Sequence, residues 1–179
     1  MNQQHIITAT QTWLTSFIIA YEICPFARQV HEQNQIRYRV LGFDTVEHCL
    51  GALLEECHHL DAEPATATTL LIFDGLCRDF DDFLDVTALA EQLLFDMGYE
   101  GVYQLASFHP DYCFAETEAD DAANYTNRSP YPMLHIIREA SIEQALKHYP
   151  EPELIPERNM ALCRKLGAAT IRALLTAQD

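Results

Sequence analysis

The sequence predicts an α/β fold: a single three-layer domain in which helices cover both faces of a mainly parallel, four-stranded sheet. Two observations support this prediction. Stretches with the pattern of strands alternate along the chain with stretches of helical periodicity, which is typical of such a sheet. The chain has 179 residues, enough for one domain and too few for two ordinary ones. We therefore expect residues 1–179 to form one domain.

Helices are expected where apolar residues recur at intervals of three and four. The first carries an apolar stripe from Ile6 to Tyr21 and should end before Pro25, because a proline disfavours helical geometry in the residue that precedes it. Pro25 can then open a short second helix that runs to His31, since proline is favoured in a first turn. The later helices are expected over residues 45–59, 80–97, 141–149 and 156–175.

Polar residues and a glycine define the ends of the later helices. Asp44 or Thr45 is expected to cap the third helix with a side-chain oxygen. Gly98 should close the fourth, because glycine tolerates the left-handed backbone that often ends a helix. Ser141 and Gln144 have the spacing of a capping box, which predicts that the fifth helix begins there.

Strands are expected over residues 36–41, 68–73, 102–109 and 132–138. The first alternates Arg37 and Arg39 with apolar residues, and the second is apolar enough to be buried on both faces. A long acidic loop, residues 110–131, joins the last two strands, so we expect the last strand to be antiparallel. The order αβαβαββα matches a thioredoxin-like core, and a ferredoxin-like variant is the alternative.

The net charge limits the classes of partner that we expect, and the N-terminal sequence indicates the cellular location. The formal net charge is −16, and such a surface repels phosphate backbones and anionic lipid heads. We therefore expect no nucleic-acid partner and no membrane partner. The N-terminus lacks a secretory signal, and no apolar run is long enough to span a bilayer. The expected location is cytoplasmic, where the six cysteines stay reduced.

The first candidate site residue is Cys24. If Pro25 opens a helix, the thiol lies at its positive end, where backbone N–H groups favour a thiolate. Arg28, one turn along, adds positive charge and can bind substrate. The alternative is a cysteine that packs as a small apolar residue at a corner between helices.

A second candidate cluster combines His109, Asn127 and Arg128. His109 falls at the carboxyl end of the expected third strand, where ligands bind in open α/β sheets. If the fourth strand is antiparallel, Asn127 and Arg128 approach the imidazole from its start. A base, an amide and a guanidinium together suit an anionic group. Alternatively, His109 holds the loop and Arg128 pairs with nearby acids.

The third candidate is a metal pair formed by His135 and Glu139. Both lie on one face of the fourth strand, about 13 Å apart if the strand is fully extended at ~3.3 Å per residue. One ion can bind both only if the chain begins to coil at Arg138. Otherwise the two side chains serve the fold. Cys113, four residues after His109, is a weak further ligand.

Three motifs occur in order along the chain: Ile23-Cys24-Pro25-Phe26-Ala27, Leu105 to Pro110 with Tyr112 and Phe114, and Asn127 to Pro132 with Leu134, His135, Arg138 and Glu139. Together they resemble the domain of unknown function 1415 family of uncharacterised bacterial and plant proteins. The resemblance covers nearly the whole chain. Isoleucine at 23, 136 and 137 departs from the expected leucine, and Cys113 lies outside the pattern. The resemblance marks the polar motif residues but implies no reaction.

Three functions follow as hypotheses. The first is an enzyme or binding protein for a small anionic molecule, in which Arg28, Asn127 and Arg128 bind the anion, His109 moves a proton and Cys24 is a nucleophile or redox thiol. The second is a metal-binding protein that uses His109, His135 and Glu139. The third is a non-catalytic interaction module whose motifs only hold the acidic loop. The sequence predicts no particular cofactor and leaves the oligomeric state open.

Overall fold

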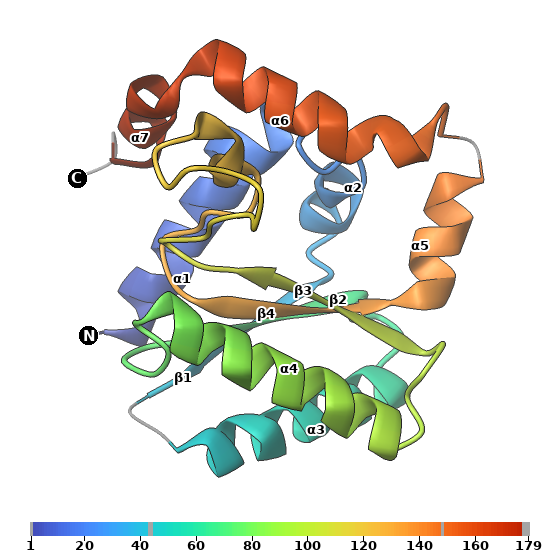
Figure 1. Ribbon diagram of the computed structural model, residues 1–179. Helices are drawn as coiled ribbons and strands as arrows, with labels where there is room; N and C mark the ends of the chain where they lie inside the picture. Colours follow the sequence, from blue (N-terminus) through green and yellow to red (C-terminus); the bar gives the residue numbers. More distant parts are fainter. Residues whose placement is uncertain (1, 43–44, 148, 177–179) are drawn as a thin grey trace.

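The four strands form one mixed sheet in the order β1-β2-β4-β3, seen in the computed structural model of the chain (Figure 1). The structure describes residues 2–42, 45–147 and 149–176. The strands are β1 (Ile36–Leu41), β2 (Thr68–Phe73), β3 (Tyr103–Phe108) and β4 (Met133–Arg138). β1 and β2 are parallel, and β4 is antiparallel to both β2 and β3. Three strands therefore point one way and the last runs against them, as the sequence predicts.

The sheet order distinguishes this fold from the two named alternatives. Along the chain the core reads βαβαββα, which differs from the βαββαβ of a ferredoxin-like fold. A thioredoxin-like core has its first strand inside the sheet, whereas β1 lies at an edge here. The α/β class and the antiparallel last strand are confirmed, and neither of the two named topologies fits.

Helices cover both faces of the sheet and complete three layers (Figure 1). α3 (Val46–Ala62) and α4 (Phe80–Asp96) cover the first, which we call the α3–α4 face. The other, the α1–α6 face, carries α1 (Gln3–Trp13), the π-helix η1 (Leu14–Ile19), α2 (Ala27–Glu32), α6 (Ile155–Leu166) and α7 (Ala168–Thr176). α5 (Glu139–Leu146) follows β4 at one end of the sheet, and the short 3₁₀ turn η3 (Pro152–Leu154) leads into α6.

Side chains of alternate strand residues separate into two cores. Leu71, Leu134 and Ile136 pack with α3 and α4, whereas Leu70 and Met133 pack with the N-terminal helices. This division follows from the two-residue period of a strand. The register pairs Leu70 with His135 and His135 with Ala106, so these residues share the α1–α6 face.

One expected helix cap is confirmed, and two other expected helix ends differ in the structure. Thr45 caps α3 by accepting a hydrogen bond from the His48 N–H at 3.3 Å, while Asp44 lies outside the described residues. α5 begins at Glu139, so the capping box at Ser141 is wrong. The expected last helix is two helices that meet at Gly167, whose φ of +80° breaks the α-helical path.

The connection between β3 and β4 is more ordered than a long acidic loop suggests. It contains a 3₁₀ helix, η2 (Ala122–Thr126), that packs against α6. The N-terminal helix is tied to the same connection, because the Trp13 Nε1–H donates to the Arg128 carbonyl at 3.0 Å. None of the described helices combines the length and the apolar character that a bilayer crossing requires.

Candidate functional site

A cavity of about 820 Å³ opens on the α1–α6 face of the sheet. Its walls come from η1 and the turn after it, β3, the connection between β3 and β4, and α6. The apolar lining is contributed mainly by Ile18, Ile23, Phe108, Phe114 and Met160. This size and lining are typical of a pocket for a small molecule.

The floor of the cavity is a consequence of strand alternation in β3. Ala106 and Phe108 point to the α1–α6 face and line the cavity, in register with His135 and Met133 of β4. The Phe108 ring packs edge-on against Trp13, with ring centroids 5.3 Å apart. The small Ala106 side chain beside it leaves space that a larger residue would fill.

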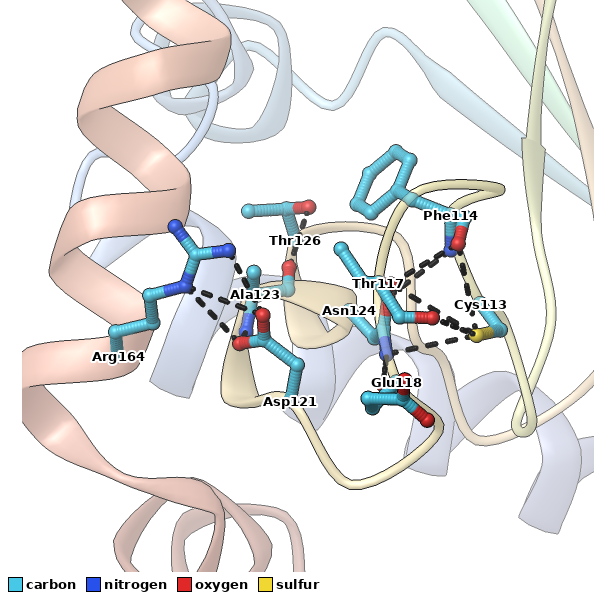
Figure 2. A network of polar contacts seen from close by, with 9 residues as sticks. All are labelled: Cys113, Phe114, Thr117, Glu118, Asp121, Ala123, Asn124, Thr126 and Arg164. Carbon is cyan, nitrogen blue, oxygen red and sulfur yellow. Dashed lines mark hydrogen bonds and ion pairs between the residues drawn. The ribbon is translucent and has the colours of Figure 1, made fainter.

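One wall is shaped by a buried amide, Asn124 in η2 (Figure 2). Its Oδ1 accepts hydrogen bonds from the Phe114 N–H at 3.0 Å and the Thr117 hydroxyl at 2.7 Å. Its Nδ2 donates to the Glu118 carbonyl at 2.9 Å, and lies 3.8 Å from the Cys113 sulfur. Because Asn124 is fully buried and satisfied, it fixes the turn that presents Phe114 and Thr117 to the cavity.

The structure places Cys24 in the cavity lining, half-buried. The predicted helix start is not at Pro25, because α2 begins at Ala27. Burial raises the pKa of the Cys24 thiol, and the opposing hydrogen bonds from the Phe26 and Ala27 backbone do not outweigh it. The thiol is therefore neutral near pH 7, and the expectation of a favoured thiolate is not met.

His109 lies outside this cavity and is fully buried. Its Nδ1 accepts from the Asp111 N–H and its Nε2–H donates to the Cys77 carbonyl, both at 3.0 Å. The imidazole packs against Phe80 and Phe83, each with a ring centroid 5.2 Å away. With both nitrogens engaged and no solvent access, His109 holds the fold and is not placed to move a substrate proton.

Arg128 and Arg28 bind main-chain carbonyls and do not line the cavity. The Arg128 guanidinium donates to the Tyr112 carbonyl at 3.0 Å and the Ala119 carbonyl at 2.8 Å, and lies 5.0 Å from the Tyr125 ring centroid. The exposed Arg28 donates to the Ile19 carbonyl at 3.2 Å. The expected meeting of the His109 and Arg128 side chains is not what the structure shows.

The two motifs are joined by hydrogen bonds to main-chain carbonyls. The His109 N–H donates to the Asn127 carbonyl at 3.2 Å, and the Asn127 Nδ2 donates to the Ser107 carbonyl at 3.2 Å. Asn127 itself lines the cavity, so it is the one member of the predicted cluster that reaches it.

The predicted metal pair is separated. His135 lies on the α1–α6 face, where its Nε2–H donates to the Thr68 hydroxyl at 2.7 Å, because that hydroxyl already donates to the Ile136 carbonyl. Burial lowers the pKa of His135 to about 4. Glu139 begins α5 and lines a different cavity, of about 360 Å³, beside α4 and β3. Across the described chain no three metal-binding side chains come together.

Comparison with known proteins agrees with the three motifs. Residues 5–173 match the model of the family described as protein of unknown function (DUF1415). The chain belongs to this family. No curated protein and no solved structure matches it.

The two polar residues that α6 contributes to the cavity lining were missed in the sequence. The Asn159 Nδ2 donates to the Ile23 carbonyl at 2.7 Å and ties α6 to the turn that carries Cys24. Arg164 lines the cavity and forms an ion pair with Asp121, as Figure 2 shows. No local signal marks either residue, because their role depends on how α6 packs against η2.

Proposed function

We propose that the chain binds a small organic molecule with a mainly apolar body in the cavity of the α1–α6 face. The observation that carries this proposal is the composition of the lining. Apolar side chains from η1, β3, the β3–β4 connection and α6 surround a few polar groups, among them the Cys24 thiol and the Asn127 amide. Apolar walls with a few fixed polar groups are how proteins bind and orient small ligands.

Binding is better supported than catalysis. A nucleophilic or redox role for Cys24 requires a thiolate, and burial raises the pKa of that thiol. A proton shuttle through His109 requires an open imidazole, and both ring nitrogens are engaged by main-chain groups. Cys24 then serves the ligand as a neutral, polarisable wall.

The proposal can be tested with the neutral dye N-phenyl-1-naphthylamine, which fluoresces strongly in apolar surroundings. We expect a saturable rise in fluorescence from one site. Ala115→Trp places a large ring in the cavity lining from an exposed position, and should weaken dye binding about tenfold by occlusion. Ala119→Trp is the matched control, since Ala119 is exposed in the same connection but does not line the cavity.

Unchanged binding in Ala115→Trp, or a loss of equal size in Ala119→Trp, would show that the dye binds elsewhere and would refute the proposal. Alkylation offers a second measurement. Bound dye should slow the reaction of Cys24 with N-ethylmaleimide, while Cys113, also half-buried but outside the lining, should react at an unchanged rate. Peptide mass spectrometry distinguishes the two thiols.

A further inference from the structure

We propose that Arg164 binds an anionic group of the cavity ligand by exchanging its partner, Asp121, for the ligand. The inference rests on the proposed function and names the class of ligand: an apolar body that carries a carboxylate, sulfonate or phosphate. Arg164 is the one basic side chain among the described residues that line the cavity. A guanidinium beside apolar walls is well suited to such an anion.

The geometry of the ion pair leaves part of the guanidinium available. Arg164 Nε lies 3.1 and 3.2 Å from the two Asp121 oxygens, and Nη2 lies 2.7 Å from Oδ2. A guanidinium has five N–H donors, so the Nη1 group lies outside this pair. The Asp121 carboxylate binds the Arg164 guanidinium in the way that we expect the anionic group of a ligand to bind it.

Replacing Asp121 by a ligand anion at Arg164 costs little free energy, for two reasons. The Arg164 side chain is 53% exposed and that of Asp121 is 21% exposed, and ion pairs in such positions contribute little to stability. Asp121 also accepts a hydrogen bond from the Ala123 N–H at 2.9 Å, so its carboxylate keeps a partner when Arg164 turns away. The same carboxylate competes directly with any ligand anion at Arg164.

The negative charge around the cavity makes Arg164 necessary for binding an anionic ligand. Glu116 also lines the cavity, and the chain carries a net charge of −16, so the general field repels an anion. An anionic ligand therefore needs a specific cation, and Arg164 supplies it. Arg158 of α6 forms an ion pair outside the lining with Glu151, which precedes η3, at 3.0 Å, and this pair serves as a control.

The test compares two dyes of similar shape: the neutral N-phenyl-1-naphthylamine and the anionic 8-anilinonaphthalene-1-sulfonate. Arg164→Gln should weaken binding of the sulfonate about tenfold and leave binding of the neutral dye unchanged. Asp121→Asn should strengthen sulfonate binding several-fold, because the competing charge is gone while asparagine still caps η2. Arg158→Gln and Glu151→Gln make the same charge changes and should alter neither dye.

The outcomes separate the two proposals. If the neutral dye binds neither the parent chain nor any variant, the proposed function is refuted, and this inference is refuted with it. If the neutral dye binds but Arg164→Gln leaves the sulfonate unaffected, the cavity stands and the role of Arg164 is refuted. If Asp121→Asn weakens sulfonate binding, the ion pair is structural and no exchange occurs.

Discussion

The two faces of the sheet are built by the same four strands but differ in how they are filled. On the α3–α4 face, Leu53, Phe83 and the His109 imidazole are fully buried, and the cavity beside α4 and β3 measures about 360 Å³. On the α1–α6 face, residues of η1, β3, the β3–β4 connection and α6 line a cavity of about 820 Å³. Strand alternation assigns neighbouring residues of β3 to opposite faces, so one strand contributes both to the α3–α4 core and to the floor of the larger cavity.

The difference between the two faces separates motif residues that stabilise the fold from motif residues that can contact a ligand. His109 and Arg128 engage main-chain carbonyls and fix the β3–β4 connection. Cys24 and Asn127 reach the open space. A shared motif thus contains residues of both kinds, and only the position relative to the cavity separates them.

We expect the largest effect from His109→Ala, which tests whether the imidazole stabilises the α3–α4 face. The change removes a fully buried ring that packs against Phe80 and Phe83, and it leaves the Cys77 carbonyl and the Asp111 N–H without the imidazole as partner. We expect the free energy of unfolding to fall by about 4 kcal/mol. Urea denaturation measures it. A loss below about 1 kcal/mol would show that the imidazole is not a structural group.

Matched truncations of one residue from each face come next. Leu53→Ala on the α3–α4 face should lower the free energy of unfolding by about 3 kcal/mol, because Leu53 is fully buried. Met160→Ala, in the cavity lining, should cost about 1 kcal/mol, because half-buried Met160 already borders open space. Equal losses in the two variants would contradict the difference in packing.

Glu56→Gln tests the charged group of the α3–α4 face. Burial alone raises the pKa of Glu56, but hydrogen bonds from Arg37, Arg39 and Thr69 outweigh it and hold the pKa below its usual value. The carboxylate therefore stabilises the fold above about pH 4.5, and this contribution is lost as the pH falls further.

In Glu56→Gln we expect a loss of about 2 kcal/mol at pH 7, measured by urea denaturation, because the two arginines are partly exposed. The acid sensitivity below about pH 4.5 should decrease in the same variant. An unchanged profile in acid would assign that sensitivity to other carboxylates.

His135→Gln probes the α1–α6 face in a different pH range. The folded pKa of His135 is about 4, below the ordinary 6.5, because burial disfavours the charged ring. The unfolded chain binds a proton more readily, so stability falls as the pH drops from about 6.5 to 4. At about 1.4 kcal/mol per pKa unit, we expect His135→Gln to reduce this decline by about 3 kcal/mol in urea titrations at several pH values. A steeper decline in the variant would contradict the assignment.

Local sequence patterns predicted the strands well. They missed the positions of site residues that depend on packing between distant parts of the chain. The bounds of β1 and β2 follow directly from alternating and continuous apolar residues. The side chain of His109 could not be assigned to a face, because it follows the last residue of β3. Arg164 lies on a helix whose partner, η2, is some forty residues away, and no local spacing reveals that contact.

The place of β4 in the sheet has a consequence for synthesis. β4 is the last strand to leave the ribosome, yet it lies between β2 and β3. Until residue 138 has emerged, β2 and β3 lack the neighbour that joins them. A nascent chain that stops earlier exposes unpaired backbone along both strands, where another chain can attach. Truncated products of this protein are therefore expected to be clients of ribosome-bound chaperones.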